Sequence, residues 1–220
     1  MSVIQKPDML SVSEIFYSIQ GESSFAGFPC GFVRLAGCNL RCVYCDTRYA
    51  YDNGTLMSID QILDRLSDFH CGLVEITGGE PLCQEDTPVL ANTLLQSGHK
   101  VIVETNGTLD IRRLPEGAIR IMDVKCPGSG ESRRMRWDNL DDLKDHDEVK
   151  FVISDESDYH WMKDVIKTRR LSEPLSIIAS PAHGKMKPER LAELILQDRL
   201  NVRLRLQLHK ILWPAAERGR

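Results

Sequence analysis

Three cysteines, Cys38, Cys42 and Cys45, lie within eight residues of one another in the spacing C-x3-C-x2-C. Thiolates this close in sequence can bind one soft metal centre, and cysteine thiolates hold iron–sulfur clusters, with four in an ordinary [4Fe–4S] cube. With only three thiolates, one iron lacks a protein ligand, and an open coordination position is where a metal does chemistry. A zinc knuckle is the alternative, but no cysteine or histidine follows at the spacing of a fourth zinc ligand. The motif therefore favours an iron–sulfur centre with one open iron.

The composition is that of one large globular domain. The chain has 220 residues, of which 42% are hydrophobic and 27% charged, enough for an independent core. Its net charge of −4 gives no basic footprint for nucleic acid, and no apolar run approaches the roughly 20 residues that span a bilayer. There is no signal-peptide pattern, and seven cysteines, three of them clustered, are typical of a reducing compartment with metal chemistry. We therefore expect a cytoplasmic protein with a single domain, residues 1–220, and neither a nucleic-acid nor a membrane partner.

Elements that would position these cysteines alternate between strand and helix from about residue 31 to residue 208. Short apolar runs predict the strands, and apolar residues at helical spacing predict the helices. A loose N-terminal arm, residues 1–11, precedes them, and a C-terminal tail, residues 209–220, follows. The expected strands are 12–19, 31–35, 72–76, 100–104, 119–124, 148–153, 175–179 and 202–208, and the expected helices are 58–69, 85–97, 139–145, 158–167 and 187–196.

This alternation predicts an α/β fold with a parallel sheet and helical crossovers. The strands are too few for a closed barrel of eight, so we expect a partial, open TIM-type barrel of about six parallel strands with outer helices. Ligands in such folds bind at the carboxyl ends of the strands. Four segments fall there: the cysteine loop, Thr77 to Glu80, Glu104 to Gly107, and Asp123 to Lys125. The sequence therefore predicts that these segments form one site.

Arginines occur at two places where they could meet anions. Arg34 interrupts an apolar strand; such a side chain usually reaches outward, and pointing inward it would need an anionic partner. The polar stretch 128–137, predicted to be a mobile loop, carries Arg133, Arg134 and Arg136. These three arginines are consistent with a solvated face or with attraction of an anion.

The cysteine loop, with Tyr44 before its third cysteine, and the segment Thr77 to Pro81 at a strand end resemble the radical S-adenosylmethionine (SAM) superfamily. The resemblance implies a [4Fe–4S] cluster on Cys38, Cys42 and Cys45, with SAM on the fourth iron. The reduced cluster would cleave SAM to methionine and a 5′-deoxyadenosyl radical, which is chemistry of the cofactors. Cofactor-binding positions implied in this way are Tyr44, Cys45, Asp46, Gly78, Gly79, Glu80, Asp123, Val124, Lys125, Ser180, Pro181, Ala182 and His183.

The segment Thr77 to Pro81 can also be interpreted from its residue types alone. The glycine pair would let a ligand approach the backbone closely, and the carboxylate of Glu80 would accept a hydrogen bond from the SAM amine. Without the cysteines, the same five residues are equally consistent with an ordinary glycine-rich turn.

Longer stretches are similar to the family of 7-carboxy-7-deazaguanine synthases. That resemblance implies a homodimeric lyase with a truncated barrel, which converts 6-carboxy-5,6,7,8-tetrahydropterin to 7-carboxy-7-deazaguanine with loss of ammonia, on the route to queuosine and other 7-deazapurines. It also implies Mg2+ as a cofactor and an electron donor such as a flavodoxin or ferredoxin. The similar segments cover nearly the whole chain and are Glu14 to Phe16, Gln20 to Glu22, Phe32 to Cys38, Cys45 to Thr47, Glu104 to Gly107, Lys150 to Ile153 and Gln207 to Lys210.

By position, this resemblance assigns Mg2+ to Thr47 and the substrate to Ile19, Gln20, Gly21, Glu22, Arg34 and Thr77. A carboxylate such as Glu22 suits the donor-rich edge of a pterin, and the guanidinium of Arg34 suits a substrate carboxylate. The hydroxyl of Thr47 is a hard oxygen ligand, although a loop-capping role is also open. His209 is either a residue of the inner face or a structural histidine.

The sequence departs from the family pattern at two places. Ser23 follows Gln-Gly-Glu where the family often has glycine, and the chain continues past Pro214, whereas in some members the C-terminus reaches the substrate. Two alternatives remain open: a glycyl-radical-enzyme activating protein, which would act on a protein partner, and a non-catalytic iron–sulfur or zinc protein. The loop at Gln20 and the inserted Arg34 favour a small anionic substrate over a protein.

Overall fold

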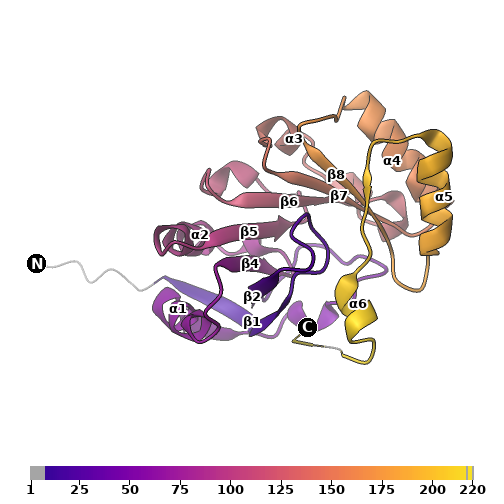
Figure 1. Ribbon diagram of the computed structural model, residues 1–220. Helices are drawn as coiled ribbons and strands as arrows, with labels where there is room; N and C mark the ends of the chain where they lie inside the picture. Colours follow the sequence, from indigo (N-terminus) through magenta and orange to yellow (C-terminus); the bar gives the residue numbers. More distant parts are fainter. Residues whose placement is uncertain (1–7, 217, 220) are drawn as a thin grey trace, which may run out of the picture.

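One nine-stranded sheet organises the computed structural model, which describes residues 8–216, 218 and 219 (Figure 1). Its order is β3-β1-β2-β4-β5-β6-β7-β8-β9, parallel from β2 to β9, with β1 antiparallel to both β2 and β3. The edges, β3 and β9, do not meet, so the predicted open barrel is confirmed. The strands are β1 (Met9–Ile19), β2 (Pro29–Leu35), β3 (Thr55–Ser58), β4 (Leu73–Gly78), β5 (Lys100–Thr105), β6 (Ile119–Val124), β7 (Glu148–Ile153), β8 (Ser176–Pro181) and β9 (Arg203–Leu204).

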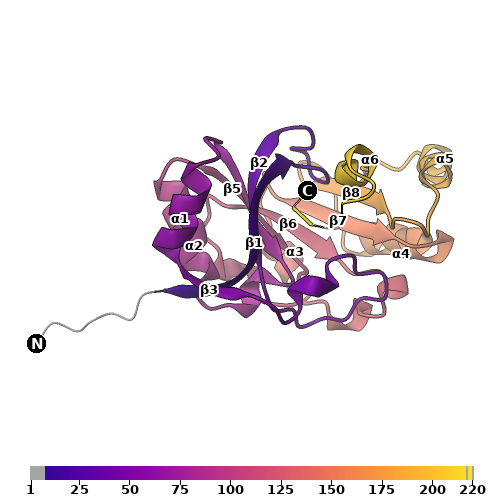
Figure 2. The ribbon, with the colours of Figure 1, turned by 90° about the horizontal axis from the view of Figure 1, so that it is seen from below.

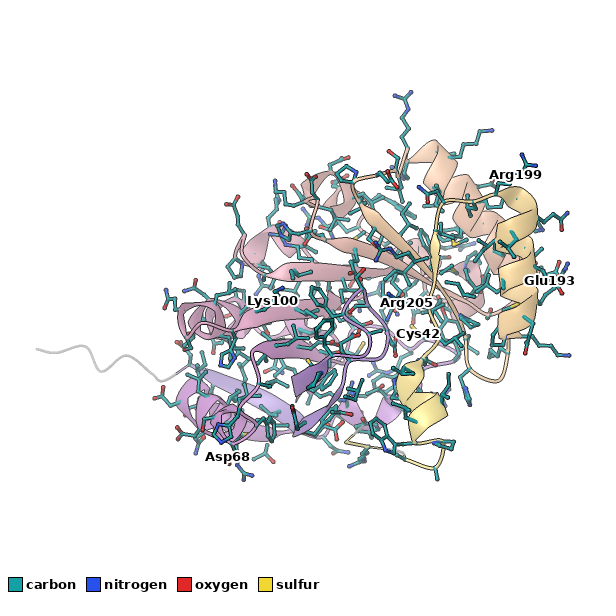
Figure 3. All side chains as sticks on the ribbon, in the orientation of Figure 1. Cys42, Asp68, Lys100, Glu193, Arg199 and Arg205 are labelled. Atoms are coloured by element: carbon teal, nitrogen blue, oxygen red, sulfur yellow. The ribbon has the colours of Figure 1, made fainter. Side chains whose placement is uncertain are left out.

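Helices cover the outer face of the sheet, and a short one crosses its open side (Figures 1 and 2). The outer helices are α1 (Ile59–Ser67), α2 (Thr87–Gln96), α3 (Asn139–Asp142), α4 (Glu156–Thr168) and α5 (Pro188–Asp198), and the crossing helix is α6 (Leu208–Leu212). The charged side chains of Glu193 on α5 and of Arg199, which follows that helix, point away from the sheet (Figure 3). Among the described helices, none combines the length and apolar character needed to cross a membrane.

Local sequence explains where the outer helices begin and which face they bury. Ser58 accepts a hydrogen bond from the backbone of Gln61, whose side chain accepts one from the backbone N–H of Ser58. This reciprocal capping box starts α1 and confirms Ser58 as the predicted N-cap. Proline in the first turn suits a helix start because no N–H is lost there, and α5 begins in this way at Pro188.

Two apolar layers hold the helices to the sheet. One lies between β1, β2, β4 and β5 and helices α1 and α2, and includes Val33, Ile62 and Leu90. The other lies between β7 and β8 and helices α4 and α5, and includes Phe151, Tyr159 and Leu191. Because side chains alternate across a strand, the opposite face is left for the interior of the barrel, where the polar site residues lie.

Both ends of the chain differ from the predicted elements. The first described strand begins at Met9, so residues 9–11 belong to β1 rather than to an arm, and residues 1–7 lie outside the described part. Of the predicted strand 202–208, only Arg203 and Leu204 pair with β8. Val202 and Leu204 pack on the second apolar layer, so the alternation in sequence reports one buried face although the chain then leaves the sheet to form α6. The predicted loop 47–55 contains a 3-10 turn, Arg48–Ala50, and runs into β3.

Candidate active site

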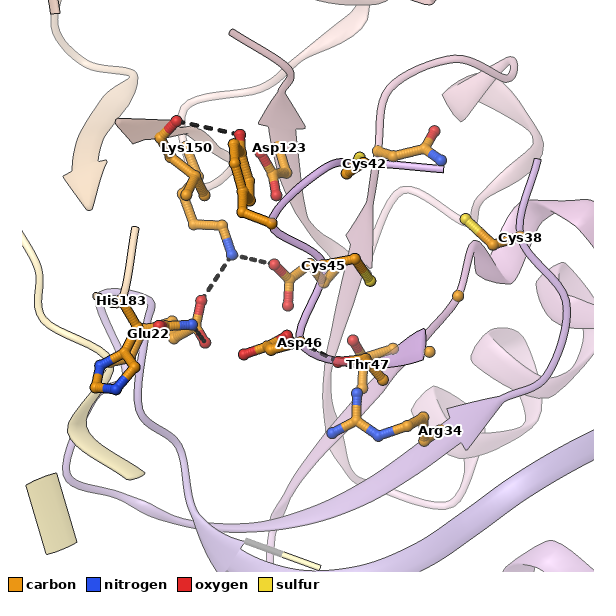
Figure 4. Close-up of a pocket in the computed structure, with 18 of the residues that line it drawn as sticks. Glu22, Arg34, Cys38, Cys42, Cys45, Asp46, Thr47, Asp123, Lys150 and His183 are labelled. Carbon is orange, nitrogen blue, oxygen red and sulfur yellow. Dashed lines mark hydrogen bonds and ion pairs between the residues drawn. The ribbon is translucent and has the colours of Figure 1, made fainter. Parts of the chain in front are cut away.

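A cavity of about 410 Å³ opens at the carboxyl ends of the parallel strands. It is lined by the loop after β1, the cysteine loop, the ends of β4 to β7 and the segment around α6. Figure 4 places the three cysteines on one side, opposite Glu22 and Lys150. We call the cysteine loop 38–51 with Gly78 and Gly79 the cluster wall, and Gln20, Glu22, Glu75, Glu104 and Lys150 the substrate wall.

The cluster wall presents three free thiols to the cavity. Cys38, Cys42 and Cys45 are half-buried, unpaired and part of the lining. The loop that carries them is held by its own arginines: Arg41 Nη1 donates to the carbonyls of Cys38 and Leu40, each at 2.8 Å, and Arg48 Nη2 donates to the carbonyl of Val43 at 2.8 Å. The thiols therefore sit on a loop whose backbone is held by hydrogen bonds from its own side chains.

The protonation of these thiols indicates what would complete the cluster wall. Burial raises the pKa of Cys38 and, together with the negative charges of Asp123 and the other thiols, raises the pKa of Cys42 to about 11, against the opposing charge of Lys125. Such thiols become thiolates when a metal replaces their protons. No three His, Cys, Asp or Glu side chains of the described residues converge tightly enough for a single metal ion. A [4Fe–4S] cluster binds each thiolate to a different iron, so three thiols spread along a wall fit it.

The glycines of the Thr-Gly-Gly-Glu segment are required by backbone packing. A Cβ on Gly78 would lie 2.2 Å from the carbonyl oxygen of Leu35, and one on Gly79 would lie 2.2 Å from that of Gly37. Gly78 also has φ +146°, a conformation that side chains disfavour. The end of β4 can therefore pack against the start of the cysteine loop, which places both glycines in the cavity wall.

Glu80 has a structural role that its predicted contact with SAM did not anticipate. It is fully buried, and its carboxylate accepts hydrogen bonds from Thr105 Oγ1 at 2.8 Å, Asn106 N at 2.6 Å and Leu82 N at 3.0 Å. These bonds join the ends of β4 and β5. The carboxylate is not part of the cavity lining, so the contact of Glu80 with the SAM amine stays a prediction that this geometry does not favour.

The remaining predicted SAM positions divide between wall and core. Asp123, Lys125, Ala182 and His183 line the cavity, as do Tyr44 and Asp46, whereas the side chains of Val124, Ser180 and Pro181 are buried outside the lining. Asp123 Oδ2 accepts from Lys125 Nζ at 2.6 Å, but Asp123 Oδ1 is buried without a hydrogen-bond partner in the described part of the chain. Because a buried acceptor normally has a donor, this oxygen fits a cofactor that brings hydroxyl groups, as the ribose of SAM does.

Every residue predicted to hold substrate lines the same cavity, namely Ile19, Gln20, Gly21, Glu22, Arg34 and Thr77. Gln20 Oε1 accepts from the backbone N–H groups of Glu22 and Ser23, both at 3.0 Å, and this builds the turn that presents Glu22. Arg34 points inward. It has the anionic partner that an inward arginine needs, since its Nε donates to Glu14 Oε1 at 2.7 Å. Only Nε is used in this bond, so the other N–H groups of the guanidinium are candidate donors to a ligand.

Buried charges on the substrate wall were not assigned from sequence. Lys150, 3% exposed, pairs with Glu22 Oε2 at 2.9 Å and also with Glu104. Burial opposes ionisation of Glu22, but the positive charge of Lys150, the charge of His209 and the hydrogen bonds from Lys150 and Gln207 together outweigh it and lower the pKa of Glu22 to about 2. Burial, and then the negative charge of Glu104, raise the pKa of Glu75 to about 8, although Gln20 Nε2 donates to Glu75 Oε2 at 3.0 Å. Besides Glu104, which pairs with Lys150, the substrate wall therefore holds Glu22 as an ionised carboxylate and Glu75 as a carboxyl group that can keep its proton.

A signal for Glu75 was present in the sequence. It is the one charged residue in the apolar strand 72–76, and it lies in register with Phe32 on β2 and Ile102 on β5. A charge at such a position must face a polar interior or a partner. Glu104 and Lys150 were noted only as parts of similar segments, and their pairing joins β5 to β7.

Helix α6 and the residue before it contact the loop at residues 20–22 and close one side of the cavity. Leu208 N donates to the carbonyl of Gly21 at 3.2 Å, and Gln207 Nε2 donates to Glu22 Oε1 at 3.1 Å. His209 lies on the inner face, where burial lowers its pKa. Gly21 allows this approach, because a Cβ there would lie 3.0 Å from His209 Nδ1.

Thr47 and Asp46 form a pair of oxygen ligands at the foot of the cluster wall. Thr47 Oγ1 donates to Asp46 Oδ1 at 3.0 Å, and both residues line the cavity. Lys210 Nζ, from α6, lies 3.3 Å from Asp46 Oδ2. Hydroxyl and carboxylate oxygens are the ligand types that Mg2+ prefers, so the pair fits that ion.

An open parallel barrel with three thiols on the loop after its first parallel strand is the arrangement of a radical SAM protein, and the family model described as the radical SAM superfamily matches residues 33–125. Two relatives named 7-carboxy-7-deazaguanine synthase are similar over nearly the whole chain. The one from Koribacter versatilis is 44% identical, covering 96% of this chain and 100% of the relative, and the one from Chlorobaculum tepidum is 46% identical, covering 96% and 97%. The chain belongs to the 7-carboxy-7-deazaguanine synthase family.

The fold is also that of a solved structure. The crystal structure of QueE from Escherichia coli superposes with a TM-score of 0.74 over 90% of this chain and 94% of that chain. Since the two sequences are 22% identical, this likeness supports the fold alone.

Proposed function

We propose that the protein is a 7-carboxy-7-deazaguanine synthase, which contracts the ring of 6-carboxy-5,6,7,8-tetrahydropterin to 7-carboxy-7-deazaguanine with release of ammonia. The observation that carries the proposal is the meeting of all six predicted substrate residues with the three cysteines around one cavity. Relatives with this name align with nearly the whole chain, which supports the same substrate. The cavity is also of the size that small-molecule sites have.

The cofactors have residues that fit them on the cluster wall. Cys38, Cys42 and Cys45 would hold the [4Fe–4S] cluster. SAM would lie against Gly78, Gly79 and the unpartnered oxygen of Asp123, and Mg2+ would be held by Thr47 and Asp46. When bound, the cluster and SAM supply the one-electron cleavage that permits hydrogen abstraction, while the protein orients the reactants and excludes water.

The substrate wall would bind and orient the pterin through its carboxyl groups. Glu22, kept ionised by Lys150, would accept hydrogen bonds from the donor-rich edge of the pterin. Arg34, anchored by Glu14, would bind the substrate carboxylate through its free N–H groups. Release of ammonia requires a proton at the leaving nitrogen. Glu75, with a pKa of about 8, would hold that proton at Oε1, because Oε2 already accepts from Gln20.

The proposal also defines partners and setting. The protein would act on a small pterin, receive electrons one at a time from a carrier such as a flavodoxin or ferredoxin, and assemble as a homodimer in the cytoplasm. The family relationship and the seven free cysteines support this set, since free thiols and a reduced cluster both need a reducing compartment.

Anaerobic reconstitution with iron and sulfide, followed by an assay with the tetrahydropterin, SAM, Mg2+ and dithionite, tests the proposal. We expect 7-carboxy-7-deazaguanine and 5′-deoxyadenosine in the products, identified by mass spectrometry. Deoxyadenosine formed without any deazaguanine would refute the substrate while leaving the protein in the radical SAM superfamily.

A further inference from the structure

The cysteine loop carries an exposed apolar side chain next to a cluster ligand, at the mouth of the cavity. Val43 follows Cys42 directly and is 56% exposed. Arg41 and Arg48, on either side of it in the loop, are also exposed. Val43 and Arg48 also line the cavity, so this exposed part of the loop lies at the cavity mouth, next to the Cys42 thiol.

A second segment completes the same surface. Val43 N donates to the carbonyl of Ser129 at 3.0 Å, and Arg41 N donates to Glu131 Oε1 at 2.7 Å. A Cβ on Gly130 would lie 3.5 Å from Val43 Cγ2, so segment 127–134 lies against the loop (Figure 2). The exposed Arg133 and Arg134 come two and three residues after Glu131, within about 11 Å of chain. The arginine stretch that sequence left undecided is therefore attached to the cysteine loop.

The charges of these four arginines are not neutralised within the protein. Arg41, Arg48, Arg133 and Arg134 take part in none of the ion pairs formed among the described residues. Arg41 and Arg48 donate to backbone carbonyls instead, and a carbonyl does not cancel a charge. Of the nearby acids that the structure describes, Asp46 pairs with Lys210, while Glu131 accepts from the backbone of Arg41 and keeps its charge, so the arginines outnumber the one unpaired acid beside them. On a chain of net charge −4, a positive surface of this kind is a local exception.

We infer that Val43 with Arg41, Arg48, Arg133 and Arg134, here called the arginine rim, is the docking surface for an acidic one-electron carrier protein. The inference rests on the proposed function, in which one electron passes from the reduced carrier to the cluster, so that the carrier is oxidised and the cluster reduced by one electron each. An apolar centre with a charged border is how protein interfaces are built. Opposite charge on the partner would speed and orient the encounter.

The position of the rim favours this partner over others. A carrier that covers Val43 comes within one residue of the Cys42 ligand, while the loop at Gly21 and α6 cover a different side of the cavity. A nucleic acid would also be attracted to arginines, but the net charge of the whole chain repels a long polyanion. The rim centre is also an aliphatic side chain rather than an aromatic one on which bases stack.

The test uses the anaerobically reconstituted holoenzyme and a purified, fully reduced flavodoxin. The variant R133E/R134E reverses the rim without touching the arginines that hold the loop, and R65E/K167E makes the same change in net charge on α1 and α4. Stopped-flow spectroscopy measures the rate of cluster reduction at low and high salt, and calorimetry measures flavodoxin affinity. For R133E/R134E we expect a rate about tenfold lower at low salt, weaker binding and less salt dependence. R65E/K167E should stay close to wild type.

Dithionite separates docking from the catalytic site. It is a small reductant that needs no protein surface, so it should reduce wild type, R133E/R134E and R65E/K167E at similar rates, and the three proteins should have the same iron content. The docking role of the arginine rim would be refuted if flavodoxin reduced R133E/R134E as fast as wild type. It would also be refuted if a single-stranded oligonucleotide displaced flavodoxin at equal concentration. Failure of the dithionite-reduced wild type to make deazaguanine would instead overturn the proposed function, with the docking result unaffected.

Discussion

The two walls of the cavity are built from different kinds of interaction. On the cluster wall, glycine backbone and thiols face the cavity, and burial raises the pKa of Cys42 to about 11. On the substrate wall, buried carboxyl groups surround Lys150, which pairs with both Glu22 and Glu104. The difference indicates that the cluster wall is built to bind a metal centre through its thiols, whereas Lys150, Glu22 and Glu104 on the substrate wall are already paired with one another. A variant on the cluster wall should therefore lose the cofactor, and a variant on the substrate wall should lose stability.

The largest effect is expected from Cys42→Ala on the cluster wall. Removal of one of three thiolates should reduce iron from about four atoms per chain to nearly none and abolish SAM cleavage, while thermal stability of the apoprotein changes little because Cys42 is half-buried. Iron analysis and a deoxyadenosine assay measure this. Cys71→Ala, away from the cavity lining, is the matched control and should retain the cluster. A full cluster in Cys42→Ala would contradict the assignment.

The substrate wall should respond in the opposite way, through stability. Lys150→Met leaves Glu22 and Glu104 without their buried counter-charge, and breaking such a pair costs about 3–5 kcal/mol of unfolding free energy. Urea denaturation of the apoprotein measures the loss. Lys163→Met, which breaks the more exposed pair with Asp198, should cost less than about 1 kcal/mol. Equal losses in the two variants would show that the Lys150 network is not paired as described.

A pH dependence should follow from Glu75. The folded protein holds the Glu75 proton up to a pKa of about 8, against 4.5 for an unperturbed glutamate. In this window the folded state binds more protons than the unfolded state, so the contribution of Glu75 to stability is complete below pH 4.5 and is lost as the pH rises towards 8. Glu75→Gln keeps a neutral side chain at every pH and should flatten this part of the curve.

The measurement is the urea midpoint at intervals from pH 4.5 to 8 for wild type and Glu75→Gln. Glu148→Gln is the comparison variant for a carboxyl group outside the cavity. Burial raises the pKa of Glu148 as well, but the residue does not line the cavity. If wild type and Glu75→Gln have parallel curves, Glu75 is ionised in the folded protein at neutral pH and cannot hold the proton assigned to it.

The smallest effect is expected where the two walls meet, at the pair of Lys210 with Asp46. This pair is partly exposed, so its loss in Lys210→Ala should cost less than about 1 kcal/mol and raise the KM for Mg2+ no more than about fivefold. Lys185→Ala, also in the cavity wall but without an ion pair among the described residues, serves as the control. An increase in KM of a hundredfold would mean that Lys210 holds the substrate itself.

Much of the cluster wall was predictable from sequence because its residues are close together in the chain. Cys38, Cys42 and Cys45 need one short loop, and the capping box at Ser58 needs one turn. Gly78 and Gly79 were also predicted as part of the site, but the reason for them was not. Their missing side chains make room for the carbonyls of Leu35 and Gly37, which only strand pairing reveals.

What the sequence determined by itself was the period of the strands and helices, the thiol spacing and the polar strand ends, all of which depend on local chemistry. Only the tertiary structure decided which charges meet. Glu75 had no role assigned to it in the predicted strand 72–76, Arg133 and Arg134 were consistent with a solvated face or an anion site, and residues 202–208 were predicted to form a full strand. Lys150 reaches Glu22 across 128 residues, and Arg41 reaches Glu131 across 90. Pairings at such separations depend on strand order and loop packing, which local pattern does not encode.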